Sequence, residues 1–244
     1  MADLDRRYAQ GTTVGRAETG VIDQGLRAYM LRVYNYMAIG LAVTGIVAWA
    51  TANYAMANPA FAQTIYGSGL KWVIIFAPLA MVFFISARIN SMGLGAAQAS
   101  FWAFAALMGL SISSIFLVYT QASITQVFFI TAASFGALSL YGYTTSKDLS
   151  AWGSFLFMGL IGIIIAMVVN IFLASTALQF AISVIGVLIF AGLTDYDTQQ
   201  IKEMYYAGDD RTVAGRKAVM GALRLYLDFL NMFMMLLSLF GGRR

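Results

Sequence analysis

Long apolar stretches fill this chain, and sparse charged residues separate them. No Asp, Glu, Lys or Arg occurs in residues 33–70, 89–146 or 149–194. A membrane-spanning helix needs about 20 predominantly apolar residues, so the second and third stretches each have room for two spans joined by a short turn. Polar residues interrupt these two stretches at 119–123 and 174–176. The pattern predicts seven helices, at about residues 31–52, 72–87, 94–118, 124–143, 151–173, 178–194 and 219–240.

The composition places these helices in lipid. Of the 244 residues, 60% are hydrophobic and only 11% are charged, whereas soluble domains carry about 25% charged residues. Open strands cannot satisfy their backbone groups in hydrocarbon, and the chain has no alternating segments typical of a membrane barrel. We therefore expect an all-α polytopic membrane protein, with a polar cytoplasmic tail at residues 1–27 and a seven-helix transmembrane domain at residues 28–244.

The basic residues predict the orientation. If the amino terminus is cytoplasmic, the inside segments hold eleven Lys or Arg residues, whereas the outside segments hold only Lys71, Arg243 and Arg244. This bias follows the positive-inside rule and explains the net charge of +4 by topology and contact with anionic lipid. The basic residues form no dense run, so we expect no nucleic-acid partner. A last helix that crosses fully would put Arg243 and Arg244 outside, whereas a re-entrant last segment would return them inside.

The missing residue types narrow the chemistry. The chain has no Cys and no His, which excludes thiol nucleophiles, iron–sulfur clusters and the commonest general base and metal ligand. Carboxylate, hydroxyl and backbone oxygens remain, and these suit hard cations such as calcium. We expect no cofactor and no enzyme activity.

Ionisable side chains inside spans are functional candidates because burying a charge in lipid costs a few kcal/mol. The candidates are Arg88, Asp195, Asp197, Arg224 and Asp228, with Asn231 on the same stripe of the last helix as Arg224 and Asp228. Residues two apart on a helix point about 200° apart, so Asp195 and Asp197 cannot enter one site, and we expect Asp195 at the surface.

Two interpretations of these residues remain open. In the first, Arg224 and Asp228, four residues apart, form an internal ion pair that makes membrane insertion tolerable. In the second, Asp228 meets Asp197 across a helix interface, with Arg88 or Arg224 as the counter-charge. Two adjacent carboxyl groups that share a proton titrate as a pair, which would make a pH sensor.

Two sequence runs resemble the Bax inhibitor-1 family of membrane proteins, in its bacterial branch. They are GLTDYDTQQI at residues 192–201 and ALRLYLDFLNMF at residues 222–233. RAYM at residues 27–30 and FFISAR at residues 83–88 extend the resemblance, which covers the chain from about residue 26 onward. It implies a seven-helix fold with a central last helix in the bacterial inner membrane.

The resemblance also implies a pH-sensitive calcium leak. The family's aspartate pair falls on Asp197 and Asp228, its partner arginine falls on Arg88, and Asp195 is extra to the pattern. In a closed form a proton would bridge Asp197 and Asp228; loss of that proton would make the two repel and would offer oxygen ligands to a transient calcium ion.

Two other functions compete with the leak. Bacterial members of the family are also linked to a membrane-bound AAA protease, so the alternative is a non-transporting regulator of such a protease or of a stress response. The two aspartates also resemble the layout of presenilin-type intramembrane proteases. The Gly-x-Gly-Asp motif of those proteases is absent, because Leu225, Tyr226 and Leu227 precede Asp228.

Overall fold

Seven long apolar helices form a bundle. The computed structural model describes the backbone of residues 2–244 and the side chains of residues 24–244. Within that part of the chain the seven predicted spans are confirmed, and no strand forms beyond an isolated bridge between Tyr119 and Arg243. The helices are α1 (Ala2–Ala57), α2 (Pro59–Ala62), α3 (Leu70–Arg88), α4 (Leu94–Ile112), α5 (Ile115–Val118), α6 (Gln121–Thr144), α7 (Ser150–Leu173), α8 (Thr176–Glu203) and α9 (Arg211–Phe240), with a π-helix at Gln63–Gly67 and a 3-10 turn at Ile89–Ser91.

The polar interruptions that divide the apolar stretches become helix caps. Thr120 accepts a hydrogen bond from the Ser123 backbone N–H at 3.3 Å and begins α6. Ser175 accepts one from the Leu178 backbone N–H at 3.3 Å and begins α8. Between α7 and α8, Ala174 adopts a left-handed backbone with φ of 47°, which ends one helix and turns the chain into the next.

The sixth predicted helix was too short. The apolar run ends at Thr194, but α8 continues to Glu203, so Asp195 and Asp197 lie inside the helix rather than at its end. Thr198, Gln199 and Ile201 are buried by neighbouring helices. A boundary drawn at the first charged residue fails here because these polar side chains pack inside the protein instead of facing lipid.

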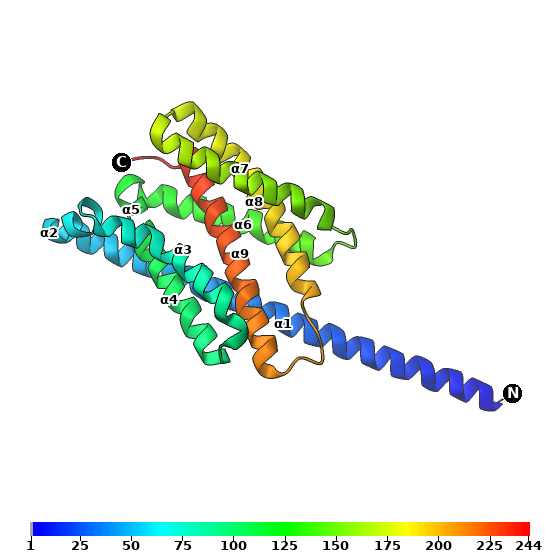
Figure 1. Ribbon diagram of the computed structural model, residues 1–244. Coiled ribbons are helices and arrows are strands. Elements are labelled where there is room, and N and C mark those ends of the chain that lie inside the picture. The colour runs from blue at the N-terminus through cyan, green and yellow to red at the C-terminus, as the bar shows by residue number, and fades with distance from the viewer. Residues whose placement is uncertain (1) are drawn as a thin grey trace.

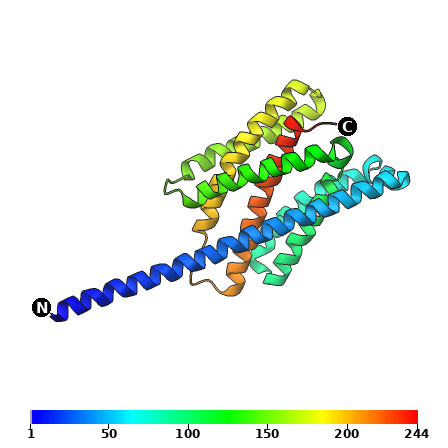
Figure 2. The same cartoon turned by 180° about the vertical axis from the view of Figure 1, so that it is seen from behind.

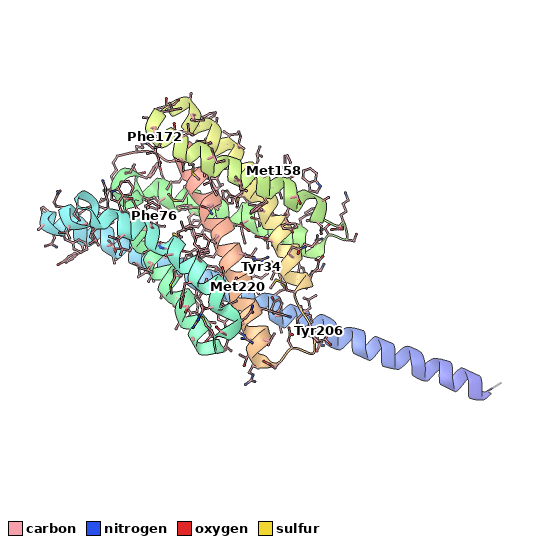
Figure 3. All side chains as sticks on the ribbon, viewed as in Figure 1. Tyr34, Phe76, Met158, Phe172, Tyr206 and Met220 are labelled. Atoms are coloured by element: carbon pink, nitrogen blue, oxygen red, sulfur yellow. The ribbon has the colours of Figure 1, made fainter. Side chains whose placement is uncertain are left out.

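The last helix is central, as the resemblance implies. In the most apolar stretch of α9, 61% of the residues are buried inside the protein, whereas in that of α7 only 11% are buried. Figures 1 and 2 show α9 between the other helices from both sides. The side chains of Met158 and Phe172 on α7 point away from the bundle (Figure 3) and are largely exposed, as expected for a lipid-facing helix.

The last helix also runs without a break. α9 is continuous over 30 residues, a length of about 45 Å at 1.5 Å per residue. Beyond it the carboxyl-terminal residues pair with the loop before α6: Thr120 N–H donates to Gly242 O at 2.9 Å, and Arg244 N–H donates to Val118 O at 3.0 Å. A helix that does not turn back favours a full crossing over a re-entrant last segment.

The boundary drawn between tail and membrane domain does not coincide with a break in the backbone. α1 is continuous from Ala2 to Ala57, and its amino-terminal part extends beyond the other helices (Figure 1). The side chains of residues 1–23 lie outside the described part of the chain, so the cytoplasmic tail stays a prediction.

Candidate functional site at the interface of two helices

The loop between α8 and α9 sets the register of the two helices. Asp210 caps α9: its Oδ1 accepts from the backbone N–H groups of Thr212 at 2.7 Å and Val213 at 2.9 Å. These bonds, that of Val213 first, lower the pKa of the exposed Asp210 carboxyl below its ordinary value. A Lys217–Asp209 ion pair at 2.5 Å also holds the loop. The two helices then run antiparallel, with extensive contact along their length.

This register brings two of the predicted carboxyl groups together. The side chains of Asp197 on α8 and Asp228 on α9 face each other across the interface, close enough for the two carboxyl groups to interact. Asp228 is only 5% exposed, and its buried Oδ2 has no N–H or O–H donor from the described side chains. Ionised carboxylates only accept hydrogen bonds, so a bond between the two carboxyl groups requires that the pair carry one proton.

The positive charge that acts on both carboxyl groups comes from Arg224. Arg224 is exposed and lies one helical turn before Asp228 on α9. Its guanidinium does not come within 4.0 Å of either carboxylate: the ion pair of Lys217 with Asp209 is the only one within that distance among the side chains of residues 24–244. The internal Arg224–Asp228 ion pair of the first interpretation is therefore not formed.

Arg88 does not take the place that the resemblance gives it. It is exposed at the carboxyl end of α3. That end meets the first turns of α9, where the Arg216 guanidinium donates to the carbonyl oxygens of Asn90 and Met92. Asp228 lies 12 residues beyond Arg216, about 18 Å along the helix at 1.5 Å per residue. In this structure Arg224 supplies the counter-charge instead.

Asp195 occupies another face of α8. It lines a cavity of about 630 Å³ together with Lys147, Trp152 and Tyr196, and its Oδ1 is buried without a hydrogen-bond partner among the described residues. A Cβ built on Gly142 of α6 would collide with the backbone carbonyl of Asp195, so α6 and α8 touch here. Asp195 is therefore partly covered rather than at the surface as expected, and it does not reach Asp228.

The family comparison agrees with the resemblance. The family described as "Inhibitor of apoptosis-promoting Bax1" matches residues 26–244. The chain belongs to the Bax inhibitor-1 family. An uncharacterized protein of Rickettsia prowazekii is 46% identical over 233 residues, which are 96% of each chain. The inner membrane protein YbhL of Escherichia coli is 48% identical over 223 residues, which are 90% of this chain and 94% of YbhL.

In this Bax inhibitor-1 family chain, the Asp197–Asp228 pair brings carboxyl oxygens together at the α8–α9 interface. Among the described residues no three His, Cys, Asp or Glu side chains gather to hold a metal ion. Calcium takes six to eight oxygen ligands, and two carboxylates supply only part of such a shell. Asn231, half-buried one turn beyond Asp228, adds a neutral amide on the same stripe.

The sequence analysis missed a buried contact between two hydroxyl groups on another face of α9. Thr44 on α1 meets the Tyr226 hydroxyl at 2.6 Å and donates to the Ala105 carbonyl at 2.8 Å. Both side chains are buried, and Tyr226 stands two residues before Asp228. A Thr and a Tyr inside apolar runs each need a partner, which signals a contact, but their separation of 182 positions hides which residues meet.

Proposed function

We propose that this protein is a pH-sensitive calcium leak channel, gated by the proton shared between Asp197 and Asp228. The observation that carries the proposal is the pair of facing carboxyl groups at the α8–α9 interface, of which Asp228 is buried. An ionisable pair is expensive to keep inside a membrane protein, and such groups usually mark ion or proton pathways. The relatives' names add only the membrane location: YbhL is called an inner membrane protein.

The gate follows from the protonation state of the pair. With one shared proton, the bond between Asp197 and Asp228 holds α8 against α9. When the proton leaves, two negative charges face each other, and their repulsion is about 4 kcal/mol at 4 Å in a protein-like dielectric. The Arg224 charge offsets part of this repulsion. The helices then separate, and the freed carboxylate oxygens attract calcium. Flux is expected to rise with pH.

The expected setting is the inner membrane of a bacterium with the amino terminus in the cytoplasm. The positive-inside rule supports this orientation. With the amino terminus inside, most of the Lys and Arg residues lie in cytoplasmic segments. Calcium then leaks inward down its gradient, and cytoplasmic pH sets the rate.

Reconstitution of the purified chain in liposomes tests the gate. Calcium entry is recorded from pH 6 to pH 8 for the wild type and for a double variant, Asp197→Asn with Asp228→Asn. The amides keep the size and hydrogen bonding of the pair but cannot lose a proton. We expect flux that rises with pH in the wild type and a flat profile in the variant. A variant with the wild-type pH profile would contradict the proposal.

The second candidate is a non-transporting regulator of a membrane-bound AAA protease or of a stress response. The amino-terminal part of α1 favours this regulator, because it extends beyond the packed helices (Figure 1) as a helical segment that a partner protein could contact. A regulator would give no calcium flux in liposomes at any pH and would co-purify with the protease. The pair would then act as a structural clamp between α8 and α9.

A further inference from the structure

A groove lies between α1 and α6, two helices that can be followed in Figure 2. Its volume is about 520 Å³, and its walls are residues 27–34 of α1 and 135–143 of α6. This size falls within the range of small-molecule sites, about 300–1,000 Å³. The walls are mostly apolar. Leu31 and Leu140 stand at the edges of the groove and are 52% and 62% exposed. Because both helices span the membrane, the open side of the groove faces lipid.

The hydroxyl groups in the floor of the groove are hydrogen-bonded to one another and need no polar ligand. The Tyr34 hydroxyl meets Ser139 Oγ at 2.7 Å, and Ser139 Oγ meets Thr198 Oγ1 at 2.9 Å. Tyr34 lies on α1 where it passes the bundle (Figure 3). These three hydroxyl groups satisfy one another, so the surface above them accepts hydrocarbon without leaving a polar group unpaired.

One end of the groove is positively charged. Arg27 lines it at the start of the α1 span. Opposite, Tyr143 lines it at the end of α6, and Lys202 donates to the Tyr143 carbonyl at 2.9 Å with its ammonium 5.7 Å from the ring centre. Both cations therefore lie at the ends of spans, where phospholipid headgroups are found. Clusters of basic side chains at this depth attract anionic lipids.

We propose that this groove is a binding site for an anionic phospholipid. One acyl chain lies between α1 and α6 over the Tyr34–Ser139 floor, and the phosphate lies between Arg27 and Lys202. The apolar length of the groove selects a chain, and its charged end selects the headgroup. The site is separate from the Asp197–Asp228 pair and does not depend on the proposed leak.

Gly136 allows the acyl-chain site to be filled by substitution. It lines the groove, and a Cβ built on it meets no atom within 4 Å, so Gly136→Leu directs a larger side chain into the groove from an unobstructed Cβ. Gly162 on α7 is the matched control, because its Cβ also meets nothing within 4 Å. The protein is extracted from bilayers of equal phosphatidylglycerol and phosphatidylcholine, and native mass spectrometry counts the lipids retained.

We expect the wild type and Gly162→Leu to retain a phosphatidylglycerol molecule that Gly136→Leu loses. Leu140→Trp, which covers the groove from its edge, is a second filling variant and should lose the same lipid if Gly136→Leu folds poorly. Equal retention by Gly136→Leu, Leu140→Trp and the wild type would overturn the site.

The headgroup contact has its own test. Replacing Arg27 and Lys202 together with Gln should keep a bound lipid but reduce the preference for phosphatidylglycerol over phosphatidylcholine several-fold. Lys71→Gln is the control, since Lys71 stands beside Trp72 at the start of α3, away from the groove. A wild type that holds both lipids equally, or a double variant that keeps the full preference, would overturn the proposed headgroup site.

Discussion

Asp195 and Asp197 lie two residues apart on one helix and have different surroundings. Asp197 faces α9, where it meets a second carboxyl group and the charge of Arg224. Asp195 faces α6 and α7, where it lines a cavity with Lys147 and no second acidic side chain. Both helix faces withdraw carboxyl oxygens from lipid, but only the α9 face pairs two of them. Both aspartates are thus partly withdrawn from solvent, but under the proposed gate only the one with a carboxyl partner responds to the loss of a proton.

The sharpest test of this contrast exchanges each carboxyl group for an amide. Asp197→Asn should remove the pH dependence, so that the ratio of calcium flux at pH 8 to that at pH 6 falls to about one. Asp195→Asn should keep the wild-type ratio, because no second carboxyl group faces it. Liposome flux measures both. Equal effects of the two variants would show that the pairing at the α9 face is not what matters.

A second test asks whether the Asp195 face is structural. A Cβ at Gly142 would overlap the backbone carbonyl of Asp195, so Gly142→Ala forces α6 away from α8. We expect a loss of about 1–3 kcal/mol, as for other overpacked sites, seen as a lower midpoint of denaturant unfolding in detergent. Gly162→Ala, whose Cβ meets nothing within 4 Å, is the control. If both variants unfold alike, the α6–α8 contact is not tight.

The spans, and the separation of Asp195 from Asp197, could be predicted from the sequence for physical reasons. Long apolar runs have one solution in lipid, so seven helices could be predicted without knowing how they pack. The angle of about 200° between Asp195 and Asp197 separated the two side chains onto different faces. Choosing Asp197 as the partner of Asp228 needed the family motif, because helix periodicity does not say which face meets which neighbour.

What the sequence analysis missed depends on contacts between distant segments. Residue spacing left Arg88 and Arg224 both open as the counter-charge and the family motif pointed to Arg88, but the position of α3 relative to α9 leaves Arg224 as the arginine whose charge acts on the pair. The continuation of α8 to Glu203 was missed because polar residues such as Thr198 and Gln199 are buried by other helices. No local pattern in the sequence records that burial.

The third prediction separates the two arginines. Without the charge of Arg224, the ionised state of the pair is less favourable, and the pair keeps its shared proton to a higher pH. Arg224→Gln should therefore lower calcium flux at pH 7 by roughly threefold to tenfold. That range corresponds to losing an attraction between Arg224 and the ionised pair on the order of 1 kcal/mol. Arg88→Gln should leave the flux profile nearly unchanged. Lower flux in Arg88→Gln with little change in Arg224→Gln would show that Arg88 is the counter-charge in the working protein.

The smallest effect on calcium flux is expected at a third aspartate, the exposed Asp210. Its two backbone hydrogen bonds hold the pKa of Asp210 below the ordinary value of 3.8. A depressed pKa gives stability that is fully present above the ordinary value and is lost as the pH falls through the lowered one. Between pH 6 and pH 8 the cap is therefore constant and cannot contribute to a pH-dependent flux.

Asp210→Asn tests this exclusion because Asn caps a helix as well as Asp but does not titrate. We expect unchanged calcium flux from pH 6 to pH 8, and a smaller loss of stability than the wild type shows when unfolding is followed from pH 5 down to pH 3. A changed flux profile would mean that the loop before α9 takes part in gating. An unchanged one, beside a flat profile in Asp197→Asn, would confine the pH response to the carboxyl group that has a partner.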